Sequence, residues 1–278
     1  MNTQLIYHPG GKIDLVEKEA EFHSNITPGF YKIEENMVGH NMYVDTDIKI
    51  PKGTDLIVDQ YIDRQYLNQF FSESSQKLHQ DMNIPHKLGI LLHGIPGTGK
   101  TTIAYALAQY YIHTQKAVVV TVKHISEYAY CTNFLRKIKE NQGDFMSIII
   151  FDECESSMSD NEDFMKRELD SSYSLSNNLN LFTTNYVQKI PEAIKDRKSR
   201  IKFCTEVLGV GDETAVFEIL DSMNLNLETS TQLPYDKIKS MVTALVNKTL
   251  DEIKNSFVDE SFEFNYVKRV LVPRTVIS

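Results

Sequence analysis

Between residues 87 and 204, short apolar runs alternate with segments whose apolar residues recur at helical spacing. The apolar runs lie at 88–93, 117–122, 147–152, 179–184 and 200–204, and the helix candidates lie near 101–112, 132–141, 162–170 and 191–196. Strands that alternate with helices, and that are apolar almost throughout, are typical of a parallel sheet covered on both faces. Ligands bind such sheets at the carboxyl ends of the strands, so functional residues are expected directly after each run.

The segments on either side of this α/β region have a different character. Residues 1–55 contain turn signals and stretches of partial strand-like alternation at 30–33 and 42–51, which predict a separate β-rich segment. Apolar residues at helical spacing predict a core-facing helix over 58–71 and further helices over 214–223 and 235–254. The domains predicted are a β-rich N-terminal segment (1–55), an α/β nucleotide-binding domain (56–204) and a helical lid with a C-terminal tail (205–278).

Composition narrows the classes of protein and partner. The formal net charge of −9 repels a phosphate backbone, which disfavours broad nucleic-acid binding but leaves room for a local basic patch. The three cysteines, Cys131, Cys154 and Cys204, are too few and too far apart for a disulfide framework or a zinc motif. With no signal peptide and no membrane-spanning apolar run, a cytoplasmic location is expected.

The segment H-G-I-P-G-T-G-K-T-T follows the first apolar run of the α/β region and precedes a helix candidate. It satisfies the phosphate-loop pattern G-x-x-x-x-G-K-[ST]. Glycines let the backbone wrap closely around phosphate, while the lysine reaches the β- and γ-phosphates and the Thr101 hydroxyl ligates Mg²⁺. The ATP-binding residues predicted are Gly94, Ile95, Pro96, Gly97, Thr98, Gly99, Lys100, Thr101 and Thr102.

Polar residues also follow the third and fourth runs of this region. Asp152 and Glu153 end the run S-I-I-I-F, and two acids at the end of a buried strand need a positive partner such as Mg²⁺. Asp152 suits the metal site, and Glu153 suits polarisation of a water that attacks the γ-phosphate. Asn185 ends L-F-T-T-N, and its amide can orient that water.

A basic run stands out in this acidic chain. In I-P-E-A-I-K-D-R-K-S-R-I-K-F, residues 190–203, five basic side chains lie within eight positions: Lys195, Arg197, Lys198, Arg200 and Lys202. A basic run by itself is usually a solvated surface. This run follows a phosphate loop and an acidic pair in the sequence, which suggests a second explanation, an arginine finger. An arginine supplied by a neighbouring subunit can stabilise charge developing on a γ-phosphoryl group.

With these elements in place, roughly residues 55 to 255 resemble the AAA ATPases of the AAA+ superfamily of P-loop NTPases. G-I-P-G-T-G-K-T-T is similar to their Walker A motif, I-I-I-F-D-E to Walker B and L-F-T-T-N to sensor 1. The resemblance implies a sheet of strand order 5-1-4-3-2, a helical lid, and a homo-oligomeric ring, usually hexameric, that binds ATP and Mg²⁺ between neighbours. Arg197 and Arg200 fall on the arginine-finger positions, so Lys100, Glu153, Asn185, Arg197 and Arg200 are the catalytic residues implied.

Four family features match less closely. The segment between the arginines holds Lys198-Ser199 in place of the more usual Pro-Gly or Pro-Ser. The pore loop would fall in S-E-Y-A-Y-C (126–131), where Tyr128 or Tyr130 could grip a threaded polypeptide or serve the core. No sensor 2 arginine is evident in the helical region, with Arg274 the remote alternative, and the adenine pocket is implied only near 55–60 and the lid.

The leading hypothesis is a Mg²⁺-dependent AAA ATPase that remodels or threads a protein partner chosen by the β-rich segment. A second hypothesis is a DNA-directed AAA+ module such as a clamp loader, helicase loader or viral DNA motor, which the basic run allows and the net charge opposes. A third is a structural switch that binds ATP without hydrolysing it, against which Glu153 and Asn185 argue.

Overall fold

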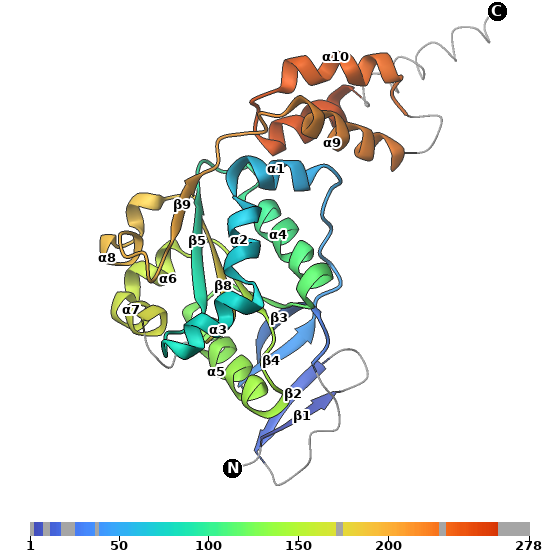
Figure 1. Cartoon of the computed structure of the whole chain (residues 1–278). Helices are drawn as coiled ribbons and strands as arrows, with labels where there is room; N and C mark the ends of the chain where they lie inside the picture. Colours follow the sequence, from blue (N-terminus) through green and yellow to red (C-terminus); the bar gives the residue numbers. More distant parts are fainter. Residues whose placement is uncertain are drawn as a thin grey trace, which may run out of the picture.

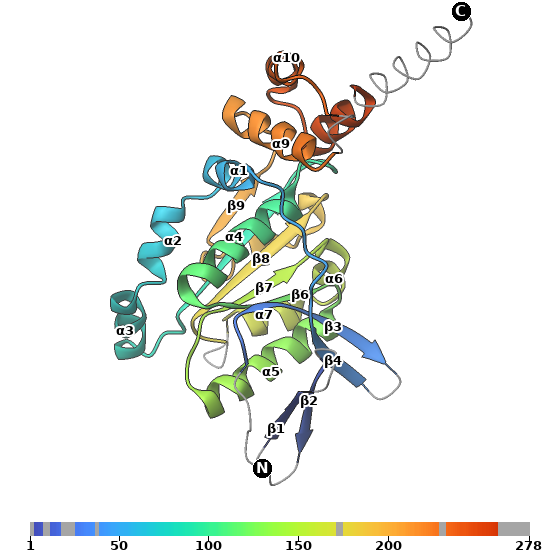
Figure 2. The same cartoon turned by 90° about the vertical axis from the view of Figure 1, so that its right-hand side faces the viewer.

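A single nine-stranded sheet organises the structure, a computed structural model that describes residues 3–7, 12–17, 26–36, 39–170, 175–227 and 232–260. Within these residues, the strands lie in the order β1-β2-β4-β3-β6-β7-β8-β5-β9 (labelled between Figures 1 and 2). Their bounds are β1 Thr3–Tyr7, β2 Lys12–Glu17, β3 Gly29–Asn36, β4 Gly39–Val44, β5 Lys87–His93, β6 Val118–Val122, β7 Ser147–Phe151, β8 Asn178–Thr184 and β9 Phe203–Glu206.

The five strands from β5 to β9 are all parallel and form the α/β core. Across the sheet they run β9-β5-β8-β7-β6, so that numbering them along the chain gives 5-1-4-3-2, the order that the family resemblance implies. Each of these strands except β9 has neighbours on both sides, and β5, β7 and β8 end at the same edge. The residues that follow these three strands are therefore brought together.

The N-terminal strands continue this sheet and do not form a separate one. β3 pairs with β6 in parallel, from Gly29 opposite Val118 to Lys32 opposite Thr121. β4 then pairs antiparallel with β3, and β2 and β1 follow. The expected strand over 42–51 is too long, because β4 ends at Val44 and residues 45–50 form no strand.

Apolar side chains on the two faces of the sheet form two hydrophobic cores. Ile148 and Ile150 of β7 belong to the core beneath α1, α2, α4 and the lid, whereas Ile149 and Phe151 belong to the core beneath α5, α6, α7 and α8. This alternation is the two-residue period of a strand covered on both faces. The helices of the α/β region are α1 Thr54–Tyr61, α2 Arg64–Phe70, α3 Glu73–Asp81, α4 Lys100–Gln115, α5 Ile125–Gln142, α6 Glu155–Asp160, α7 Glu162–Asp170, η1 Val187–Lys189 and α8 Glu192–Lys195.

The single helix expected over 58–71 is divided into α1 and α2. Ile62 is extended, with φ −133° and ψ 123°, and ends α1. The Asp63 side chain then accepts a hydrogen bond from the backbone N–H of Tyr66 at 2.9 Å and caps α2. The spacing of the apolar residues does not predict this break between the helices, because a capping aspartate interrupts a helix without changing the apolar pattern around it.

The lid consists of α9 (Glu213–Leu225), α10 (Tyr235–Leu245) and a helical segment over residues 250–260. It lies beyond α1, at the end of the molecule away from β1 and β2 (Figures 1 and 2). The helix expected over 235–254 is broken after Leu245, where Asn247 has a φ of 66°. Thr249 and Glu252 exchange hydrogen bonds and start the last segment as a capping box. No helix in the described ranges is long and apolar enough to cross a membrane.

Candidate nucleotide-binding and catalytic site

The phosphate loop connects β5 to α4 and is shaped by glycine at its tightest points. Gly97 and Gly99 have φ angles of 82° and 94°, values that favour glycine. Space also demands glycine, since a Cβ on Gly97 would lie 2.9 Å from an Asp251 carboxylate oxygen and one on Gly99 would lie 3.0 Å from Leu250. The lid therefore packs directly on the loop. The loop's fit to a phosphate chain rests on the backbone N–H groups at the start of α4.

Lys100 lies inside the loop with its side chain buried. Its Nζ donates hydrogen bonds to the carbonyl oxygens of Gly94, at 2.9 Å, and Ile95, at 2.8 Å. Burial lowers the pKa of Lys100, and the charges of Asp152, Glu155 and Glu153 oppose that shift. The side chain is thus held where a phosphate bound in the loop would meet an ammonium group.

Asp152 joins the end of β7 to both neighbouring elements. Its Oδ1 accepts a hydrogen bond from the hydroxyl of Thr101, at 2.7 Å, and from the hydroxyl of Thr183, at 2.6 Å. Thr101 and Asp152 are hard oxygen donors of the kind that Mg²⁺ prefers. Among the described residues, no group of three or more His, Cys, Asp or Glu side chains could hold a metal.

Glu153 and Asn185 face one another beside this pair. Glu153 has a φ of 49°, a conformation that non-glycine residues rarely adopt, and its side chain is exposed. The Asn185 Nδ2 lies 3.5 Å from Glu153 Oε1, at the outer limit of a hydrogen bond. Unfavourable backbone conformations are concentrated at functional sites, where the surrounding structure maintains them.

A cavity of about 220 Å³ brings most of the predicted residues together. It is lined by Pro96, Gly97, Gly99, Lys100, Thr101, Thr102, Glu153, Thr183, Thr184, Asn185 and Asp251. Asp152 touches this set through Thr101 and Thr183. Of the remaining loop residues, Thr98 is buried and its hydroxyl donates to the carbonyl oxygen of Ile95, so it supports the loop's shape.

Three lining residues, Thr183, Thr184 and Asp251, were not predicted. The two threonines precede Asn185, and hydroxyls at the end of a buried strand could have been noticed as potential partners for the acids. Asp251 enters from the lid, where its backbone N–H donates to the Gly97 carbonyl at 3.1 Å. The sequence feature that could have drawn attention to Asp251 is the capping box T-L-D-E (249–252), which predicts a helix start at Thr249, two residues before Asp251.

The two predicted finger arginines lie outside the cavity and differ from each other. Arg200 is 8% exposed, and its guanidinium donates to the Ala193 carbonyl and to Asp170. The side chain of Arg197 is 60% exposed and donates to Asp170 Oδ2 at 2.7 Å. Arg200 precedes β9, so the strand expected over 200–204 begins later, at Phe203. A turn formed by hydrogen bonds from Arg200 and Ile201 to the Arg197 carbonyl delays it.

Asp170, the last residue of α7, anchors the basic run. Besides the two arginines, it accepts a hydrogen bond from the hydroxyl of Ser199 at 3.2 Å. Burial alone would raise the pKa of the Asp170 carboxyl, but hydrogen bonds and charge from Arg200, with Ser199 and Arg197, hold it below its usual value. At least one negative group that pairs with this basic run, the Asp170 carboxylate, therefore belongs to the same chain.

The expected pore loop over 126–131 is wrong, because these residues belong to α5. Tyr128 is buried, stacks on Phe151 and donates a hydrogen bond to Asn180 Oδ1, so it serves the core. Tyr130 stacks on His40 of β4. The connection between β6 and α5 consists only of Lys123 and His124, since the Glu127 side chain accepts from both backbone N–H groups and starts the helix early.

The adenine-pocket candidates are described in part. In the segment 55–60 and just after it, Gln60 Oε1 accepts from the N–H of Gly211, and the Tyr61 hydroxyl accepts from the N–H of Gly209. These bonds join α1 to the connection between β9 and the lid. Arg274, the remote sensor 2 alternative, lies outside the described residues.

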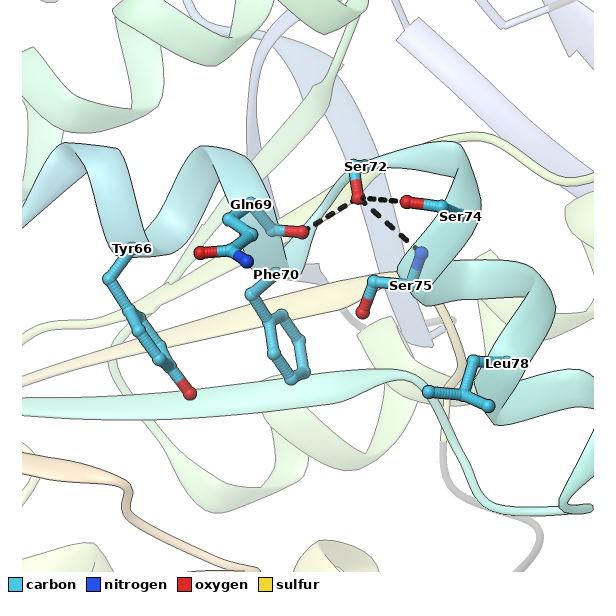
Figure 3. A pocket seen from close by; sticks show the side chains of 7 residues that line it. All are labelled: Tyr66, Gln69, Phe70, Ser72, Ser74, Ser75 and Leu78. Atoms are coloured by element: carbon cyan, nitrogen blue, oxygen red, sulfur yellow. Dashed lines mark hydrogen bonds between the residues drawn. The ribbon is translucent and has the colours of Figure 1, made fainter.

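A second cavity, of about 430 Å³, lies on α2 and α3 and shares no residue with the first. It is lined by Tyr66, Gln69, Phe70, Ser72, Ser74, Ser75 and Leu78 (Figure 3). Its serine hydroxyls include the N-cap of α3, since Ser72 Oγ donates to the Gln69 carbonyl and accepts from the N–H of Ser75. These polar groups serve the helix start, and the cavity offers no comparable cluster of charged groups.

Comparison with known proteins agrees with the geometry. Residues 90–207 match the family model described as "ATPase family associated with various cellular activities (AAA)". No curated protein matches the chain. The matched range begins in β5 and ends just after β9, so it contains the phosphate loop, the acidic pair, Asn185 and both arginines. Residues 90–207 are therefore similar to the AAA ATPases, a family of nucleotide-binding proteins.

Proposed function

We propose that this chain is a Mg²⁺-dependent ATPase that works as a homo-oligomeric ring, hexameric in the usual AAA arrangement, and remodels or threads a protein partner. The observation that carries the hydrolytic part is the bonded cluster at the strand ends. Asp152 accepts hydrogen bonds from Thr101 and Thr183, and Glu153 and Asn185 lie in the same cavity as Lys100. These are the groups that ATP hydrolysis requires, gathered from three elements.

Each residue has a role that follows from its position. The loop from Gly94 to Thr102 holds the phosphates through its backbone N–H groups, and Lys100 neutralises charge on the β- and γ-phosphates. Thr101 and Asp152 would hold Mg²⁺, which when bound screens the phosphate charge. Glu153 accepts a proton from the attacking water, and Asn185 orients that water.

The ring part of the proposal rests on the arginines. Neither arginine lines the cavity of its own chain, so an arginine of this pair would act on the nucleotide of a neighbour. Arg197 suits that role because its side chain is 60% exposed. Arg200 would act indirectly. It contacts Asp170, which also binds Arg197, and so helps to position the exposed arginine. Arginine is suited to this task because it is always charged and binds phosphate oxygens bidentately.

The partner and the compartment complete the proposal. A protein partner suits the acidic chain, and a cytoplasmic location suits three free cysteines, of which Cys131 and Cys154 are buried. The segment 1–55 would select the partner. The DNA-directed alternative predicts ATPase stimulation by DNA with a steep salt dependence.

One set of measurements tests these parts. ATP turnover is measured with Mg²⁺ and with EDTA, and native mass is measured with and without ATP. Mg²⁺-dependent turnover together with an ATP-stabilised oligomer is the expected result. A chain that stays monomeric at full turnover would overturn the ring. If DNA stimulates ATP turnover and protein mixtures do not, the proposal of a protein partner is wrong and the DNA-directed alternative takes its place.

A further inference from the structure

Thr183, the next-to-last residue of β8, contacts both acids of the proposed site. Its side chain is 1% exposed. The hydroxyl donates to Asp152 Oδ1 at 2.6 Å and accepts a hydrogen bond from the backbone N–H of Glu153 at 3.0 Å. Its carbonyl oxygen accepts from the N–H of Cys154, also at 3.0 Å. One residue of β8 therefore holds three consecutive residues that follow β7.

For Asp152, this bond determines how the carboxylate is presented. Thr101 and Thr183 both donate to Oδ1, one from α4 and one from β8. In the described part of the chain, no hydrogen-bond donor engages Oδ2. The carboxylate is held from two sides by one oxygen, which restricts its rotation and keeps the other oxygen available for a cation or its water.

For Glu153, the same hydroxyl stabilises an unusual backbone conformation. A left-handed φ of 49° at a non-glycine residue is unfavourable and persists only where surrounding contacts maintain it. The N–H of Glu153 would lose its partner without the Thr183 oxygen. A threonine hydroxyl has one proton to donate and lone pairs to accept, so it can hold both acids at once.

We propose that Thr183 is a positioning residue for ATP hydrolysis, setting the orientation of the metal-site carboxylate of Asp152 and of the Glu153 backbone. The inference rests on the proposed hydrolytic function and deepens it. Thr183 acts by holding the two acids. Loss of its hydroxyl should therefore change the Mg²⁺ requirement and the turnover more than nucleotide binding by the phosphate loop, which Lys100 and the glycines form.

The test compares Thr183→Val, which keeps the shape and removes the hydroxyl, with Thr183→Ser, which keeps the hydroxyl. Thr121→Val is the matched control, because Thr121 is a buried threonine of β6 whose hydroxyl, among the described residues, bonds to Tyr105 alone, at 3.3 Å. Each variant is measured for kcat, for the Mg²⁺ concentration at half-maximal rate, for ADP affinity in EDTA, and for ADP affinity across a Mg²⁺ titration.

We expect Thr183→Val to lower kcat about 30-fold, a loss of roughly 2 kcal/mol of transition-state stabilisation. It should raise the required Mg²⁺ concentration several-fold and leave ADP affinity in EDTA within about twofold. Thr183→Ser should stay within about threefold of the parent in kcat, and Thr121→Val should match the parent. A general loss of packing would lower ADP affinity in EDTA as well, which separates it from positioning.

Three results would overturn the inference: parent-like kcat and Mg²⁺ dependence in Thr183→Val, an equal loss in Thr183→Ser, or an equal loss in Thr121→Val. If Thr183→Val does not fold, Thr183→Ala is measured in its place against the same criteria. If the parent binds nucleotide but shows no turnover, the proposed hydrolysis fails. The Mg²⁺ titration of ADP affinity then still decides whether Thr183 positions Asp152.

Discussion

The phosphate cavity and the basic run each contain a buried basic side chain, but the groups that surround the charge differ. In the cavity, Lys100 is enclosed by loop carbonyls and surrounded by groups that suit phosphate and metal. In the basic run, Arg197 and Arg200 converge on Asp170, away from that cavity. The cavity is assembled from residues of one chain, and neither arginine lines it. Mutations in the two regions are therefore expected to have different effects.

The largest effect is expected in the cavity, from Glu153→Gln. This change removes the proton acceptor and preserves the shape of the side chain, so turnover should fall about 1,000-fold while ATP still binds. The variant should also retain its oligomer in ATP. Turnover is measured by phosphate release, and a parent-like rate would show that Glu153 does not accept the proton.

Arg197→Ala should reduce turnover about 100-fold and leave nucleotide affinity within about twofold, because the side chain lies outside its own cavity. Mixing it with Glu153→Gln subunits provides the control. Mixed rings contain interfaces with both intact groups, so some activity should return. An intact mixed ring without recovery at any ratio would contradict action in trans.

Arg200→Ala should act mainly on stability, which distinguishes the two arginines. Removing the buried Arg200 guanidinium takes away the donor to the Ala193 carbonyl and leaves Asp170 with only Arg197 and Ser199, and should lower the free energy of unfolding by roughly 3 kcal/mol. Arg197→Ala, at an exposed pair, should cost less than about 1 kcal/mol. Urea unfolding measures both. Equal losses would remove the structural difference on which the assignment of Arg197 rests.

The smallest effect is expected from Asp251→Asn, in the lid. Removing a negative charge beside the phosphate loop should strengthen ADP affinity about threefold at low salt, and the gain should shrink as salt screens the charge. Glu252→Gln, one residue further along the helix and outside the lining of the cavity, is the comparison variant. Unchanged or weaker binding in Asp251→Asn would show that this carboxylate does not oppose the phosphates.

The position of a residue in the fold was easiest to predict from the sequence where a motif is local. The phosphate loop, the acids after β7 and Asn185 after β8 follow apolar strands, and parallel strands bring their carboxyl ends to one edge. The prediction from the sequence failed at Tyr128, because helix α5 begins early enough to bury a residue expected in a loop. It missed Asp251, because its approach to Gly97 depends on how the lid packs against the α/β region.

By itself, the sequence determined the class of fold and which polar residues follow its strands, because apolar periodicity and a phosphate-loop motif are encoded in neighbouring residues. Only the tertiary structure decided which hydroxyls hold the acids and which of the two arginines is exposed. Thr183 lies 31 residues from Asp152, and Arg200 lies 30 from Asp170. Contacts over such separations are selected by packing of the whole sheet, and no local pattern carries that information.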